Sequence, residues 1–338
     1  MIAGRFRVPA GVAAMAMMVG ASALVAAAAG AQSAKPVAAN PLTERAALIA
    51  QDPPYRPALL QLKDIPRGTA PAQSLFNGQD LSAWDSWLGV ADPKKTYTRD
   101  NGEPGGLNND PAHVFSVVQT DGAPAILING KQWGALISRQ PYSSYHLRLQ
   151  FKWGEGKWMK GFERNSGIVY HSHGEYGAFF KTFMSGIEFE IVPHMVGMLF
   201  KVGPGNDIMK LTDTQVGANA LAGKDASLPY PSRRYSPLGK LVPLKYPAVN
   251  VMSATDAEKP LGEWNTLDLY TVGNRSIHVV NGVPVMAAQD FTTTDGSTGK
   301  PRPLTGGRIQ LQSEGAEIYF RDITIEPIRR LPRIVVSR

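Results

Sequence analysis

The stretch from Arg164 to His194 is dense in side chains that can bind metals or transfer protons. Half of the chain's six histidines lie here, and with the nearby acids the set comprises Glu163, His171, His173, Glu175, Glu188, Glu190 and His194. Imidazole and carboxylate groups ligate ions such as Zn²⁺ or Mn²⁺, and either group can act as a general base. The spacing matches no established metal motif, so the residues alone leave both roles open.

Strand periodicity predicts how these side chains are placed. Residues at i and i+2 of a strand project from the same face. Glu188 and Glu190 therefore share a face, and His171 and His173 share a face of the preceding strand, whereas Ile187 and its alternates point into the core. We expect His171 and Glu188, on neighbouring strands, to form the centre of a functional site.

The chain around this stretch is predicted to be all-β. Short β-branched or aromatic runs, bounded by Gly, Asn, Asp and Pro, recur from Ser74 onward, among them HVFSVVQT, YHLRLQFKW, NTLDLYTVG and EIYFRDITIEP. Asn281-Gly282 stands between two apolar runs, which is a strong hairpin signal. Many closely spaced strands of this kind predict an antiparallel sandwich or barrel.

The N-terminus has the features of an export signal. Arg5 and Arg7 precede an apolar run that ends in Ala29-Gly30-Ala31. A basic start, an apolar centre and a small-x-small end are typical of a secretory signal peptide, and a membrane-spanning helix is the less favoured alternative. We therefore predict a signal peptide over residues 1–31, cleavage near Gln32, and a periplasmic or extracellular protein without a membrane span.

Composition divides the remainder of the chain. Residues 32–70 are rich in Pro and Ala and are predicted to form a leader, residues 71–328 the folded domain, and residues 329–338 a basic tail. Within the domain, residues 203–262 are rich in Pro, Gly, Ser and Asn and are predicted to form a long loop insertion.

The net charge of +7 is scattered, so no nucleic-acid partner is expected, and no Gly-rich phosphate loop indicates a nucleotide cofactor. The chain has no cysteine, which excludes disulfides and thiolate chemistry.

A conventional glycosidase needs two suitably spaced carboxyl groups. Glu188-Phe189-Glu190 resembles the start of the laminarinase-type motif Glu-x-Asp-x-x-Glu, but the second catalytic position falls on Pro193 or His194. This departure makes a conventional glycoside hydrolase a less favoured alternative.

Six motifs in sequence order resemble one known family. They are SLFNGQDLSAWDSW (74–87), NSGIVYH (165–171), SGIEFEI (185–191), KPLGEWNTLDLYTVGN (259–274), HVVNGVPV (278–285) and GRIQLQSEGAEIYFRDITI (307–325). Together they make the chain similar to the 3-keto-disaccharide hydrolases, also described as 3-keto-glucoside 1,2-lyase/3-keto-2-hydroxyglucal hydratase domains.

The resemblance implies a concanavalin-like jelly-roll sandwich of two antiparallel sheets that acts on sugars oxidised at C3. A ketone at C3 acidifies the C2 proton, so a base can remove it and the C1 substituent can leave by β-elimination. Hydration of the resulting 2-hydroxyglucal makes the net reaction a hydrolysis. Such a site needs one base and an electrophile for the enolate oxygen, such as a metal, Arg or Lys.

The resemblance also assigns roles. Glu188, His171 and Glu190 are the predicted catalytic residues, with the roles of base and ligand open between Glu188 and His171. A divalent ion would be held by His171, Glu188 and His173. Asn165, Gln312 and Glu175 are the predicted substrate-binding residues. The implied partners are a 3-keto-glycoside and a separate sugar 3-dehydrogenase that makes it. A non-catalytic carbohydrate-binding or adhesion module is the alternative from another class.

Overall fold

The structure is a computed structural model that describes residues 56–96, 98, 102–158, 164–203, 215–221, 234–244, 250–295 and 297–337. These residues form strands, apart from turns and two short 3₁₀ helices, η2 (Pro57–Leu59) and η3 (Pro93–Lys95). None of the helices in the described ranges is long and apolar enough to cross a bilayer. The predicted signal peptide (1–31) and the leader up to residue 55 lie outside the described residues.

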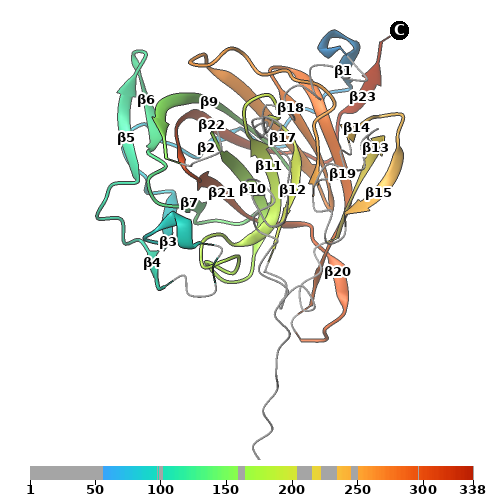
Figure 1. Cartoon of the computed structure of the whole chain (residues 1–338). Helices are drawn as coiled ribbons and strands as arrows, with labels where there is room; N and C mark the ends of the chain where they lie inside the picture. Colours follow the sequence, from blue (N-terminus) through green and yellow to red (C-terminus); the bar gives the residue numbers. More distant parts are fainter. Residues whose placement is uncertain are drawn as a thin grey trace, which may run out of the picture.

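Two large antiparallel sheets form the sandwich (Figure 1). In spatial order, the nine-stranded sheet comprises β16 (Asn250–Val251), β12 (Leu199–Val202), β11 (Ser185–Ile191), β10 (Ser166–His173), β21 (Gly306–Ser313), β7 (Gly134–Ser138), β3 (Trp84–Val90) and β4 (Pro104–Leu107), with β8 (Tyr142–Ser143) paired to β21. The predicted all-β, jelly-roll class is confirmed.

The second sheet has twelve strands. In spatial order it comprises β14 (Arg234–Tyr235), β13 (Gln215–Leu221), β19 (Val283–Thr294), β18 (Arg275–Val280), β17 (Asn265–Val272), β9 (Tyr145–Lys157), β22 (Ala316–Pro327), β6 (Ala123–Ile128) and β5 (Phe115–Thr120). Off this path, β15 (Lys240–Leu244) pairs with β13, β2 (Gln73–Ser74) with β22 and β20 (Pro301–Pro303) with β19. β13, β14, β15 and β16 fall within residues 203–262, so part of the predicted loop insertion extends the two sheets.

Both ends of the described chain meet in a third, small sheet. β1 (Leu60–Lys63), from the predicted leader, pairs with β23 (Arg333–Val336), from the predicted basic tail. Figure 1 shows the two strands side by side at the top of the view. The Arg333 guanidinium and the Asp64 carboxylate close the end of this pair. The leader therefore lies on the domain at this point rather than hanging free of it.

The core lies between the two large sheets. Alternate residues of β9, including Leu147, Leu149 and Phe151, face Ile168 and Phe189 of the other sheet, and all five are buried. The Asn281-Gly282 turn joins β18 to β19 with both residues at positive φ, as the hairpin signal predicted. Alternation in the sequence thus predicted which faces meet.

One polar network crosses this core. The Nδ1–H of His278 donates to the Gly197 carbonyl at 3.0 Å, so its Nε2 accepts from the Tyr170 hydroxyl at 2.9 Å. The Tyr170 oxygen in turn contacts the Ser276 hydroxyl at 2.7 Å. Burial lowers the pKa of His278 to about 3, so the ring is neutral and serves as a structural bridge from β18 to β10.

A carboxylate clasp holds the turn between β11 and β12. Oε1 of Glu258 accepts the indole N–H of Trp153 at 3.0 Å, and Oε2 accepts the backbone N–H of His194 at 2.9 Å. The His194 ring pairs with Asp256 at 2.9 Å. Burial raises the pKa of Glu258 to about 7, although the two hydrogen bonds act in the opposite direction.

We predict that Glu258 contributes to the pH dependence of stability. The folded protein holds the Glu258 proton more tightly than the unfolded chain, so the free energy of unfolding should fall as pH rises from about 4.5 to about 7, by up to about 3 kcal/mol. Glu258→Gln should remove this part of the profile, measured by urea unfolding at successive pH values. The exposed Glu263→Gln is the control, and the prediction is wrong if the two profiles coincide.

Candidate active site

Strand β11 places its two glutamates on the face of the nine-stranded sheet that points away from the twelve-stranded sheet. Ile187, Phe189 and Ile191 are buried in the core between the sheets. Glu188 and Glu190 alternate with them and therefore project from the opposite face, as the periodicity predicted. We call this outer surface of the nine-stranded sheet the site face.

Cross-strand register aligns a row of side chains on the site face. Directly paired residues of an antiparallel sheet share a face. The order of paired residues across neighbouring strands is Phe200, Glu188, Val169, Gln310, Ile137 and Asp85. This row joins β12 to β3 and connects Glu188 to residues far from it in sequence.

Gly167 makes room for the polar centre of the site. It lies opposite Glu190, and a Cβ at this position would collide with Oε1 of Glu188 and with Oε1 of Gln312. These two side chains therefore meet above the bare backbone of Gly167. The predicted residues Glu188 and Gln312 come together here because one strand position lacks a side chain.

The Glu188 carboxyl is almost completely buried, with 4% of the residue exposed. Burial is the main cause that raises its pKa well above the usual value, and the negative charges of Glu190 and Glu314 raise it further. A hydrogen bond from Gln312 acts in the opposite direction without offsetting them. Glu188 is therefore a carboxyl of unusually high proton affinity.

Three buried side-chain oxygens of predicted site residues lack hydrogen-bond partners within the described part of the chain. They are Oε1 of Glu188, Oε1 of Gln312 and Oδ1 of Asn165. Asn165 precedes β10 and is 1% exposed, as is Gln312. A buried acceptor without a donor costs about 1–3 kcal/mol, so such a group is suited to a ligand that brings hydroxyl donors.

His171 does not join this cluster. Strand β10 is irregular between Tyr170 and His173, and His171 adopts a φ of +51°. The bulge turns the ring into the core, where its Nε2 donates to the Gly273 carbonyl at 3.2 Å and its edge meets the ring of Tyr145. Burial lowers the pKa of His171 to about 4, so the ring is neutral. The expected face-sharing of His171 with Glu188 is wrong, because alternation fails at a bulge.

His173 also turns toward the twelve-stranded sheet. Its Nδ1–H donates to the His171 carbonyl at 2.9 Å, and its Nε2 accepts from the Thr293 hydroxyl at 3.0 Å. Both ring nitrogens therefore have protein partners away from Glu188. Glu175 lies exposed in the connection that follows, and Glu163 is outside the described residues.

The predicted metal ligands His171, Glu188 and His173 consequently do not converge. No group of three or more His, Cys, Asp or Glu side chains in the described ranges is arranged to hold an ion. These residues do not fit the expected metal set, and we assign no chemical step to a metal.

A second apolar cluster covers part of the site face. The connection between β10 and β11, residues 174–184, folds back onto the sheet and buries Phe183 and Met184 against Val169 and Phe200. The backbone N–H of Met184 donates to the side-chain oxygen of Gln310 at 3.0 Å. We call residues 174–184 the cover. The cover was not predicted, although its phenylalanines, Phe179, Phe180 and Phe183, are a signal in the sequence for a buried segment.

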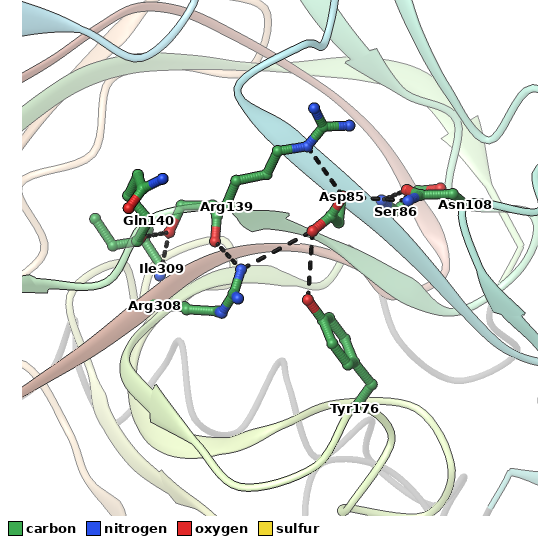
Figure 2. Close-up of polar contacts among 9 residues, drawn as sticks. Asp85, Ser86, Asn108, Arg139, Gln140, Tyr176, Arg308 and Ile309 are labelled. Atoms are coloured by element: carbon green, nitrogen blue, oxygen red, sulfur yellow. Dashed lines mark hydrogen bonds and ion pairs between the residues drawn. The ribbon is translucent and has the colours of Figure 1, made fainter.

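Asp85 forms a hub at the end of the row, as Figure 2 shows. Its Oδ1 accepts from Nε of Arg139 and Nδ2 of Asn108, both at 3.1 Å. Its Oδ2 accepts from the Tyr176 hydroxyl at 3.3 Å and lies 3.9 Å from Nη1 of Arg308. Sequence reasoning missed this hub because its members are separated by up to 223 positions in numbering, and nothing local marks them as partners.

Comparison with solved structures returns sandwich proteins of low sequence identity. A Parabacteroides distasonis protein assigned as a glycosyl hydrolase is 16% identical, with 76% of this chain and 94% of that chain covered and a TM-score of 0.40. A carbohydrate-binding module from Bacillus subtilis is 12% identical, with 63% and 91% covered and a TM-score of 0.36. A non-specific endo-β-1,3(4)-glucanase of family GH16 is 12% identical, with 82% and 95% covered and a TM-score of 0.40.

Among curated proteins, no sequence matches the chain significantly. The 3-keto-α-glucoside-1,2-lyase-like domain, in contrast, matches residues 71–326. This match includes Glu188, Gln312 and Asn165 and extends over most of the chain. The protein therefore belongs to the family of 3-keto-α-glucoside-1,2-lyase-like domains.

Proposed function

We propose that this carbohydrate-active domain cleaves 3-keto-glycosides by elimination and hydration, with Glu188 as the base. One observation carries the proposal: a buried carboxyl of raised pKa, that of Glu188, meets the buried side-chain oxygen of Gln312, which lacks a donor. Family membership supplies the substrate class, and the site chemistry agrees with it.

A carboxyl with a raised pKa suits this reaction. The proton on C2, next to the C3 ketone, is only weakly acidic, so a base stronger than an ordinary carboxylate removes it faster. The same carboxyl, once protonated, can return a proton in a later step. Glu188 can thus serve in both halves of the reaction.

The steps balance without a redox partner. The ionised Glu188 takes the C2 proton, and the electron pair forms the enolate of the C3 ketone. The enolate collapses to a C1–C2 double bond while the C1–O bond breaks, and the leaving oxygen takes up a proton. Water then adds its oxygen to C1 and a proton to C2, which gives the free 3-keto sugar.

Asn165 and Gln312 are suited to orient the sugar. Their buried side-chain oxygens can accept hydrogen bonds from ring hydroxyls, and so recover the cost of burial. A substrate without those hydroxyls would leave the acceptors unpaired, which is how buried polar groups create specificity.

The proposal requires a separate sugar 3-dehydrogenase, because the substrate must already carry the C3 ketone. It also includes export to the periplasm or the exterior, as the residues of 1–31 predict. N-terminal sequencing of the protein recovered from the producing cells tests this part. Export is contradicted if residues 1–31 are retained.

We predict that Glu188→Gln lowers kcat/KM on a nitrophenyl 3-keto-glucoside by about 10²–10⁴-fold, because the amide cannot accept the C2 proton. The amide keeps the size of the side chain and removes a buried ionisable group, so the melting temperature should not fall. The unoxidised parent glucoside, measured beside it, should not be cleaved by the natural protein. Cleavage of the parent would favour a conventional glycosidase, and binding of sugars without turnover would favour a binding module.

We predict that kcat/KM of the natural protein rises with pH through one ionisation above the ordinary glutamate value. The base must be ionised to act, and its pKa is raised. The measurement is kcat/KM from pH 4 to 9 on the same keto substrate. A plateau reached already below about pH 5 would contradict the assignment of Glu188 as the base.

We predict that Gly167→Ala lowers kcat/KM about tenfold or more, because the new methyl group displaces Glu188 and Gln312. Overpacking should also cost about 1–3 kcal/mol of stability, which calorimetry can measure. A double-mutant cycle supplies the control: in the Glu188→Gln background the same substitution should have little further effect on activity. If the effects of the two substitutions on kcat/KM are fully additive, Gly167 does not act through Glu188, and the prediction is wrong.

A further inference from the structure

The cover is held in place by defined hydrogen bonds and side-chain contacts. Backbone hydrogen bonds from Phe179 to the Phe183 carbonyl (2.8 Å) and from Thr182 to the Phe179 carbonyl (2.9 Å) close it into a compact turn. The Thr182 side chain packs directly above Gly89 of β3, where a Cβ would collide with it. The Lys181 carbonyl accepts the indole N–H of Trp87 at 3.0 Å. The cover thus lies across the site face as far as β3.

The same cover packs on the residues that flank Glu188. Val169 and Phe200 are the residues directly paired with Glu188 on its two neighbouring strands. Both belong to the apolar cluster that Phe183 and Met184 of the cover complete. Lifting the cover would therefore uncover the two cross-strand neighbours of Glu188.

The Asp85 hub secures the start of the cover. Tyr176 of the cover donates its hydroxyl hydrogen to Asp85. Its ring stacks on Trp87 with centroids 5.7 Å apart, and the Arg308 guanidinium lies 5.9 Å from the ring centroid. Arg308 is itself fixed by the Ser138 carbonyl at 2.9 Å. In Figure 2, Tyr176 rises toward Asp85 from the cover, and Arg308 reaches the same carboxylate from β21.

The position and the contacts of Asp85 argue against direct contact with the substrate bound at Glu188. Its side chain is 16% exposed, and both carboxylate oxygens are engaged by Arg139, Asn108, Tyr176 and Arg308. It stands on the order of 20 Å from Glu188, because four strand spacings of about 4.8 Å separate β3 from β11. It therefore cannot touch the same sugar ring as Glu188, and its influence must pass through the cover.

We propose that Asp85 is a positioning residue that, through Tyr176 and Arg308, holds the cover closed so that Glu188 works in a water-excluded site. The inference rests on the proposed role of Glu188 as the base. Its consequence is specific: removing the negative charge of Asp85 frees Tyr176, the cover opens more often, and water reaches the Glu188 carboxyl.

The test compares Asp85→Asn, Tyr176→Phe and Arg139→Gln with the natural protein. Arg139 is 52% exposed and donates to Oδ1 of Asp85, whereas Tyr176 donates to Oδ2, so the Arg139 variant is the matched control. With Asp85→Asn we expect amide hydrogen exchange at Thr182 and Met184 to accelerate about tenfold or more, and the midpoint of the pH profile to move toward lower pH. Tyr176→Phe should shift both readouts in the same direction by less, and Arg139→Gln should shift neither.

Two readouts keep this test independent of the proposed function. If the natural protein does not turn over 3-keto-glycosides, the proposed function fails, but titration of the Glu188 carboxyl by ¹³C NMR still measures the effect of Asp85. Faster exchange together with a lower Glu188 midpoint supports the inference. An unchanged midpoint, with or without faster exchange, overturns it, because Asp85 would then be only a local brace. If Asp85→Asn does not fold, the same criteria apply to Tyr176→Phe.

Discussion

The exclusion of water from one carboxyl group is the constraint on which the site depends. Glu188 stands on the outer face of a sheet, where a glutamate would ordinarily be solvated. It is nevertheless buried, between its cross-strand partners Val169 and Phe200 of an apolar cluster, and this burial raises its pKa, as do the negative charges of Glu190 and Glu314. Burying this carboxyl costs stability and raises its pKa. Strongly shifted pKa values of this kind are typical of functional sites.

Antiparallel register explains how distant segments contribute to this site. Six of the nine strands, from β12 to β3, each supply one residue to the row from Phe200 to Asp85, and the pairing fixes which residues share a face. A shift of one residue in any of these strands would send its contribution into the core. The bare backbone at Gly167 then provides the space in which Glu188 and Gln312 meet. The geometry of the site is therefore set by the register of the sheet.

The sequence predicted those parts of the structure that depend on local alternation. It separated Ile187 and Phe189 from Glu188 and Glu190, located the Asn281-Gly282 hairpin and indicated the all-β class. It failed at His171, because a bulge with positive φ rotates the ring into the core and alternation carries no sign of it. It also missed Asp85, whose four partners come from separate segments and meet only once the sheet has formed. The strands of residues 203–262 were missed because their sequence resembles a loop.

Burial has opposite effects on the pKa values of the two candidate bases in the sequence, His171 and Glu188. Desolvation disfavours the charged form of any group, so it lowers the pKa of a histidine and raises that of a glutamate. His171 is buried with a pKa of about 4 and is therefore a weaker base than a free imidazole, and its Nε2–H already donates to Gly273. Glu188, buried to a similar degree, becomes a stronger base than a free carboxylate. Burial on opposite faces of the same sheet thus lowers the proton affinity of His171 and raises that of Glu188.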